Sequence, residues 1–284
     1  MEELASGALV GATECAICQP FDMVKTRHHL NRGVNPSPLA SLAHIYAEGG
    51  LLRFYRGVGP EFCGMVPKNA SMYAAYEWTR RALKRHTALD DVTIAFVAGV
   101  VAGPAETAVV QPFQVVKVRM QTKEFNARYA SSLDCAAHVL RSEGVGGFFR
   151  VGVSATLWRN TVWNSVYFGS MAKMRAATVD MPHESGSSWR RKLLDLASGF
   201  GCGVLATCFN APFDVAKSRQ QSQLPGSARP YGGTFATLAR IASEEGLAAC
   251  YAGFQAKALR MGLAGLVGLS SFDAAQWLLS KAPT

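Results

Sequence analysis

The sequence predicts an all-α membrane protein in which six transmembrane helices form three pseudo-symmetric repeats, with three short surface helices between them. Three observations predict this fold: a phrase that recurs three times, long apolar segments, and glycines at matching offsets in every copy. The phrase begins at Pro20, Pro112 and Pro212, at intervals of 92 and 100 residues. A period of this length is too long for the common soluble solenoids. We therefore divide the chain into repeats at 1–86, 87–180 and 181–284, which together form one transmembrane domain.

The first apolar segment of each repeat is rich in small residues and ends at the recurrent phrase, at 4–20, 92–112 and 193–212. The second of them has about the length needed to cross a bilayer core of roughly 30 Å at 1.5 Å per residue. Pairs of small residues four positions apart let helices approach closely in lipid. Such pairs stand at the same offsets before each proline: Gly7 and Gly11, Gly99 and Gly103, Gly199 and Gly203.

The recurrent phrase places a proline ahead of an acid and a base that lie one helical turn apart. The first copy has Asp22 and Lys25, and the third has Asp214 and Lys217. A proline inside a helix removes a backbone hydrogen bond and kinks the helix. Three such helices, two of them ending in an acid and a base and the second in Gln114 and Lys117, indicate a ring that can close and open.

Each repeat continues with a short amphipathic stretch and a second apolar segment. The amphipathic stretches, at 37–48, 130–143 and 232–245, end in an acid and a glycine. The second apolar segments lie at 58–80, 153–175 and 254–279. None of the six apolar segments is free of charge, and charge is costly in lipid unless it faces protein or water. We therefore expect the six helices to surround a wet cavity.

The composition excludes several classes of function. The net charge of +9 is spread along the chain without a basic stripe interleaved with aromatics, which argues against a nucleic-acid partner and favours a membrane surface or anionic substrates. Seven scattered cysteines do not form a disulfide framework. No nucleophile-base set, phosphate loop or metal cluster is apparent, so we expect neither an enzyme nor a cofactor or metal.

These features together resemble the mitochondrial carrier family, the solute carrier family 25 type. The resemblance rests on the threefold Pro-x-[Asp/Glu]-x-x-[Lys/Arg] phrase and the acid-glycine run followed by an aromatic, and it covers practically the whole chain. It implies six tilted helices around a cavity in a multi-pass protein of the mitochondrial inner membrane. It also implies transport by alternating access, both termini in the intermembrane space, a monomer, and cardiolipin as a lipid partner at helix N-termini near 57, 152 and 253.

The resemblance assigns the charges after each proline to a gate on the matrix side, where they bridge neighbouring repeats. Asp22 is expected to pair with Lys117, and Asp214 with Lys25. The third pair joins Gln114 to Lys217 and lacks its acid, so it provides a hydrogen bond without a full ion pair. The bracing positions beneath these pairs are occupied by His29, Gln121 and Gln221.

A second gate is implied at the cytoplasmic mouth, where the family pattern is aromatic-acid-x-x-base. It is complete at 76–80 and lacks one charge in each of the other repeats. Pairing across neighbours leaves Glu77 with Arg175 and Asp273 with Arg80.

The residues that read the substrate are expected where the three repeats differ, because packing and gating need the same residues in each. Aligning the second helices groups Gly64 with Arg159 and Arg260, and the resemblance to the family implies that this triplet lies at the midplane of the cavity. Lys68 lies about one turn from Gly64, and the next triplet consists of Met65, Asn160 and Met261. Arginine binds a carboxylate bidentately, so this set predicts a site for at least two carboxylates.

Two acids in the first helices, Glu14 and Glu106, stand six residues before their prolines. They are candidates for balancing the arginines, holding a proton, or pairing with a neighbouring helix.

Within the family, the segments 156–160, 166–169 and 212–219 are most similar to the mitochondrial 2-oxodicarboxylate carriers, although Asn160 stands where histidine is usual. The resemblance implies an antiporter of 2-oxodicarboxylates and dicarboxylates, such as 2-oxoadipate and 2-oxoglutarate. The alternatives are a tricarboxylate (citrate) carrier and, from another class, a non-transporting membrane scaffold protein.

Overall fold

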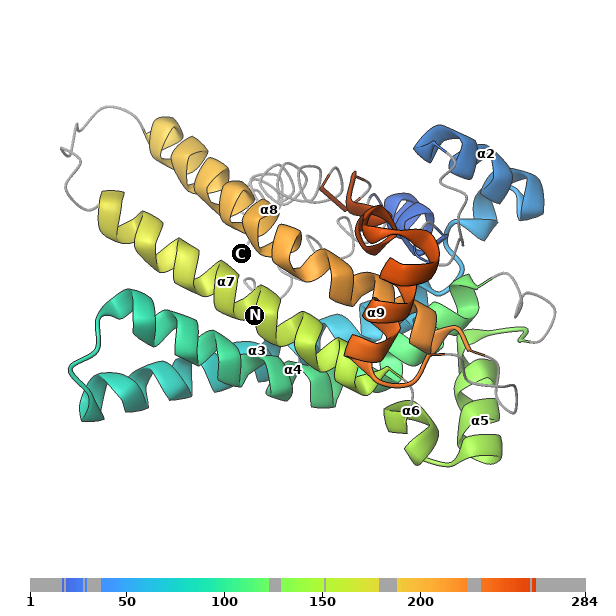
Figure 1. Cartoon of the computed structure of the whole chain (residues 1–284), viewed down its shortest axis with the longest axis horizontal. Coiled ribbons are helices and arrows are strands. Elements are labelled where there is room, and N and C mark those ends of the chain that lie inside the picture. Colours follow the sequence, from blue (N-terminus) through green and yellow to red (C-terminus); the bar gives the residue numbers. More distant parts are fainter. Residues whose placement is uncertain are drawn as a thin grey trace, which may run out of the picture.

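Four long helices lie side by side along the longest axis of the molecule, and the short helices gather at one end (Figure 1). The long helices are α3 (Val58–His86), α4 (Asp91–Gln121), α7 (Val153–Thr178) and α8 (Ser188–Gln221). The computed structural model describes residues 17, 19–27, 29, 37–122, 129–150, 152–178, 188–223, 231–255 and 257–258, and this part of the chain contains no strand. Along the bundle, α3 packs against α4, α4 against α7, and α7 against α8.

The long helices have the dimensions of membrane spans. With 26 to 34 residues each, they extend about 39–51 Å at 1.5 Å per residue. Two of them, α4 and residues 196–221 of α8, are also apolar enough by composition to cross a membrane. Both helices continue beyond Pro112 and Pro212, so the recurrent phrases form the last turns of the same helices. Of the predicted first segment, 4–20, residues 17, 19 and 20 are described and helical, and the helix includes residues 21–27 of the recurrent phrase.

The three surface helices lie close to where the amphipathic stretches were predicted. They are α2 (Pro38–Gly49), α5 (Ser132–Glu143) and α9 (Thr234–Glu245). Each is followed by a short turn of helix that the sequence did not predict: η1 (Leu51–Arg53), α6 (Gly146–Arg150) and η3 (Leu247–Tyr251). Left-handed glycines end the surface helices at Gly50, Gly144 and Gly246, with φ of 66°, 68° and 86°. In the first repeat this glycine is therefore Gly50 and not Gly49.

Each surface helix is held in the same way to the helical residues of the recurrent phrase that precedes it. An arginine from the recurrent phrase reaches the acid that ends the surface helix: Arg27 to Glu48 at 2.5 Å, Arg119 to Glu143 at 2.7 Å, and Arg219 to Glu245. Beneath each pair lies a small apolar cluster, such as Val116, Met120, Tyr129 and Cys135 in the second repeat. Clusters at equivalent places are centred on Met23 and Ile45 in the first repeat and on Val215 and Ile241 in the third.

The glycine pair of α4 lies at a close contact with α7. A Cβ atom added at Gly99 would come within 2.7 Å of the backbone of Asn164 and Ser165, and one at Gly103 within 2.4 Å of Thr161. The small-residue pattern therefore marks a close helix contact here, as predicted. Gly7 and Gly11 lie outside the described residues.

Candidate functional site

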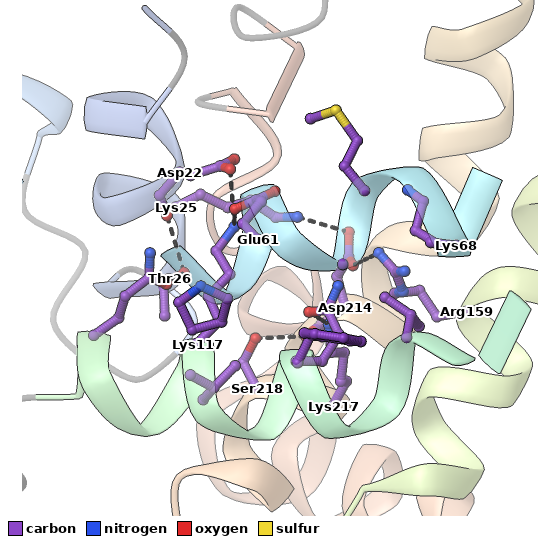
Figure 2. A pocket seen from close by; sticks show the side chains of 18 of the residues that line it. Asp22, Lys25, Thr26, Glu61, Lys68, Lys117, Arg159, Asp214, Lys217 and Ser218 are labelled. Carbon is purple, nitrogen blue, oxygen red and sulfur yellow. Dashed lines mark hydrogen bonds and ion pairs between the residues drawn. The ribbon is translucent and has the colours of Figure 1, made fainter. Parts of the chain in front are cut away.

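A polar cavity of about 310 Å³ lies among the long helices, next to the end that carries the surface helices. Residues 22–29 and the helices α3, α4, α7 and α8 all contribute to its lining. Figure 2 shows its charged side chains, with Asp22, Thr26 and Lys117 on one side and Lys68 and Arg159 on the other. Among the described residues, the charged lining residues are five bases and three acids: Lys25, Lys68, Lys117, Arg159, Lys217, Asp22, Glu61 and Asp214.

Three contacts join the repeats at the closed end of this cavity, and we call them the gate links. Lys117 Nζ lies 3.0 Å from Asp22 Oδ2, and Lys25 Nζ lies 3.2 Å from Asp214 Oδ2. Lys217 Nζ donates to Gln114 Oε1 at 2.5 Å. These are the three pairs expected from the sequence, with the third held by an amide oxygen.

Two further charges that the sequence analysis missed enlarge this network. Glu61, on the first turn of α3, bonds to Lys117, and Lys257 Nζ lies 2.6 Å from Asp214 Oδ2. Each stands four residues after a left-handed glycine, Gly57 or Gly253. The equivalent residue of the second repeat is Thr156, so comparing this position across the repeats would have shown the difference in charge.

The residues at the bracing positions form hydrogen bonds between repeats, but not to the charged side chains above them. Gln121 Oε1 accepts from Thr26 Oγ1 at 2.8 Å, and His29 Nδ1 lies 2.8 Å from Ser218 Oγ. Gln221 Nε2 donates to Thr156 Oγ1 at 3.3 Å. The closed end therefore has a second layer of neutral bonds beneath the gate links.

Arg159 extends into the cavity toward the gate links. Its Nη1 lies 3.7 Å from Asp214 Oδ1, and its Nη2 donates to Asn160 Oδ1. Its Nε is buried without a hydrogen-bond partner. Asn160 itself is 3% exposed and donates to Thr107 Oγ1 at 3.0 Å, so it does not line the cavity. The amide orients Arg159 from behind, which differs from the direct substrate contact that the sequence suggested.

Lys68 lies farther along the cavity and is the most exposed of these bases. Its Nζ is 3.8 Å from Glu106 Oε1, and Glu106 also accepts a bond from Asn164 Nδ2 at 2.8 Å. Of the alternatives for Glu106, the structure shows a pairing with the neighbouring helices α3 and α7.

Met65 and Gly64 line the same cavity, and Phe113 covers Gly64 so closely that an added Cβ would lie 2.9 Å from the ring. Glu14 and Arg260, the other predicted contacts, lie outside the described residues.

The opposite end of the bundle does not have the expected pair of Glu77 with Arg175. Glu77 instead bonds to Arg80 and Arg81 of its own helix, at 3.3 and 3.0 Å. Asp273, the expected partner of Arg80, lies outside the described residues. Within the part of the chain that the structure describes, the gate links are closed at one end while Glu77 makes no bond to another repeat at the other. No cluster of three or more potential metal ligands occurs in that same part.

The chain is similar to a known protein family and to several of its members over most of its length. The family model described as mitochondrial carrier protein matches residues 1–87, 90–181 and 188–283. A probable mitochondrial 2-oxodicarboxylate carrier of Dictyostelium discoideum is 34% identical over 264 residues, covering 92% of this chain and 85% of the relative. The human mitochondrial 2-oxodicarboxylate carrier is 32% identical over 280 residues, covering 95% and 92%. Mitochondrial citrate transporter D of Aspergillus niger is 32% identical over 282 residues, covering 95% and 91%.

Proposed function

Because the chain belongs to the mitochondrial carrier family, we propose that it exchanges 2-oxodicarboxylates and related dicarboxylates, such as 2-oxoadipate and 2-oxoglutarate. Membership makes it a multi-pass transporter of the mitochondrial inner membrane and not an enzyme. Several relatives at 31–34% identity carry the name 2-oxodicarboxylate carrier. The substrate class proposed here agrees with those names.

The excess of positive charge in the cavity is the observation that supports a dianionic substrate. In the part of the chain that the structure describes, five basic side chains and three carboxylates line the cavity. Lys257 and Glu106, which each contact a lining residue, leave the excess of two positive charges unchanged. Charges removed from water need compensation, and a dicarboxylate would supply it.

We assign the binding of carboxylates to Arg159, Arg260 and Lys68, with Gly64 and Met65 shaping the space between them. Asn160 orients Arg159, and Glu106 holds Lys68 until a substrate carboxylate competes for it. Arginine suits this task because its planar fork forms two parallel bonds to a carboxylate.

We further propose that the gate links close the matrix side, and that Glu77 and Arg175, with Asp273 and Arg80, close the cytoplasmic side after the matrix side opens. In this scheme the structure corresponds to a state open toward the cytoplasm. The repeats at 1–86, 87–180 and 181–284 work as one transmembrane domain in a monomer, and cardiolipin binds at the helix ends near Gly57, Gly152 and Gly253.

Exchange in liposomes tests this function. The purified protein is reconstituted into vesicles preloaded with 2-oxoadipate, 2-oxoglutarate, malate or citrate, and uptake of labelled 2-oxoglutarate is followed. We expect fast uptake against internal 2-oxodicarboxylates and slow uptake against citrate. Fastest exchange with citrate identifies a tricarboxylate carrier, as the Aspergillus niger relative is named. No exchange with any di- or tricarboxylate refutes the proposal and favours a scaffold.

A further inference from the structure

The two lysines that end the second and third copies of the recurrent phrase differ in their counter-charges. Lys117 lies between two carboxylates, those of Asp22 and Glu61. Lys217 is only 6% exposed, and among the described residues its hydrogen-bond partner is the neutral amide of Gln114. The negative charge at the closed end of the cavity is therefore gathered on the side of Lys117.

The side of the cavity around Lys217 has the opposite imbalance. Asp214 is contacted by Lys25 at 3.2 Å, by Lys257 at 2.6 Å and by Arg159 at 3.7 Å. Lys217 follows Asp214 by one helical turn and lines the same cavity, as Figure 2 shows. In the described part of the chain, the buried carboxylate of Asp214 is thus the counter-charge near four bases: Lys25, Lys257, Arg159 and Lys217.

Such an arrangement is unfavourable without a further anion. Removing a charge from water costs several kcal/mol per ion unless a partner compensates for it. The Nε atom of Arg159, which lines the same cavity, is also buried and without a hydrogen-bond partner. For the described residues, the charges and the unused donor both favour a further negatively charged group near Arg159 and Lys217.

We propose that Lys217 and Arg159 form a subsite for one carboxylate of the transported substrate, which takes the place of the acid that the phrase lacks at Gln114. This inference rests on the proposed function, because the occupant is an end of the transported dicarboxylate. It adds Lys217 to the binding residues, to which the sequence had assigned only a gating role.

The neutral residue at position 114 makes this exchange of partners feasible. A carboxylate adds the attraction between opposite charges to its hydrogen bond with an ammonium group, which a neutral amide oxygen does not. A substrate carboxylate therefore displaces the Gln114 amide from Lys217 and opens the gate link between the second and third repeats. The same carboxylate competes with Asp214 for Arg159. Binding at the subsite thus weakens the closed end of the cavity, whereas an acid at position 114 would hold Lys217 against the substrate.

The test uses the full-length protein with Gln114→Glu, which keeps the shape of the side chain and adds only a charge. Gln114→Asn is the matched neutral control, and Lys217→Gln removes the cation without adding an acid. The unfolding temperature of each purified protein is measured with and without 2-oxoglutarate, a monocarboxylate and sulfate, and KM and Vmax are measured in liposomes.

We expect 2-oxoglutarate to raise the unfolding temperature of the wild type and of Gln114→Asn. The shift should be lost in Gln114→Glu and Lys217→Gln, with KM for 2-oxoglutarate raised about tenfold or more, which corresponds to about 1.4 kcal/mol. The proposal is overturned if Gln114→Glu changes Vmax and leaves KM and the shift at wild-type values. It is also overturned if sulfate stabilises the wild type as well as 2-oxoglutarate does, since the occupant is then an inorganic anion. If 2-oxoglutarate raises the unfolding temperature of the wild type but not of Gln114→Glu or Lys217→Gln, the subsite is supported even where the liposomes show no exchange of any carboxylate. In that case only the proposed transport function is refuted.

Discussion

Replacing Arg159 tests the proposed binding of the substrate most directly. In the structure its guanidinium is 3.7 Å from Asp214, beyond hydrogen-bond distance, and its bond to Asn160 uses one nitrogen. A substrate carboxylate therefore meets a guanidinium that has donors to offer. A hydrogen bond to a charged group contributes about 1.5–3 kcal/mol. Losing one such contact in Arg159→Gln should raise KM for 2-oxoglutarate by about 10- to 150-fold.

The closed gate should survive this change, because Asp214 keeps Lys25 at 3.2 Å and Lys257 at 2.6 Å. The unfolding temperature without substrate should accordingly stay close to the wild-type value. Arg159→Lys keeps the charge but loses the planar fork, so it should fall between the wild type and Arg159→Gln.

The assay is the initial rate of labelled 2-oxoglutarate uptake into preloaded liposomes over a range of external concentrations. A KM of Arg159→Gln within twofold of the wild type would show that this arginine does not bind the substrate. Equal defects in Arg159→Lys and Arg159→Gln, with a lowered unfolding temperature in both, would point to a role in folding instead.

Three further predictions concern packing, the gate and a buried thiol. Gly103→Ala should destabilise the protein by about 1–3 kcal/mol, because the added Cβ has no room against α7. Gly201→Ala is the control and should be harmless, because nothing lies within 4 Å of its added Cβ. Thermal unfolding in detergent compares the two variants. A double-mutant cycle of Asp22→Asn and Lys117→Gln should show a coupling of about 0.5–3 kcal/mol in the free energy of unfolding. Additive effects of the two substitutions would contradict a direct link between these residues. Burial raises the pKa of the Cys135 thiol to about 11, so at about pH 7.5 maleimide should modify this thiol only after the protein is denatured. Peptide mass spectrometry follows the modification. Rapid labelling of Cys135 in the native protein would contradict this prediction.

The repeat architecture followed from the sequence, because three copies of one phrase recur in register. The partners of Asp22 and Asp214 followed from the resemblance to the mitochondrial carrier family, which implied how the charges of neighbouring repeats pair. The surface helices were predicted within about two residues of their observed starts, because amphipathic periods and acid-glycine endings are local signals.

The remaining parts of the site depend on packing that the sequence does not encode locally. Arg159 and Asn160 are neighbours on one helix, and only the packing of α7 against α4, where Asn160 bonds to Thr107, decides that Arg159 alone lines the cavity. The roles of Glu61 and Lys257 depend on how the first turns of two other helices pack against the phrase. In the proposed scheme, Glu77 pairs with Arg175 only when the cytoplasmic side is closed. The same sequence adopts both the state with that side closed and the state with it open, so the sequence alone does not say which pair is formed in this structure.

The arginine-glutamate pairs that hold the surface helices have a mechanical consequence. Arg119 lies two residues beyond Lys117, and it fixes α5 through Glu143 at 2.7 Å. Any displacement of the end of α4 therefore carries α5 with it. Leu133, 83% exposed on α5, is a suitable attachment point for a spectroscopic label. Such a label would report the opening of the gate links from the surface of the molecule, without a probe inside the cavity.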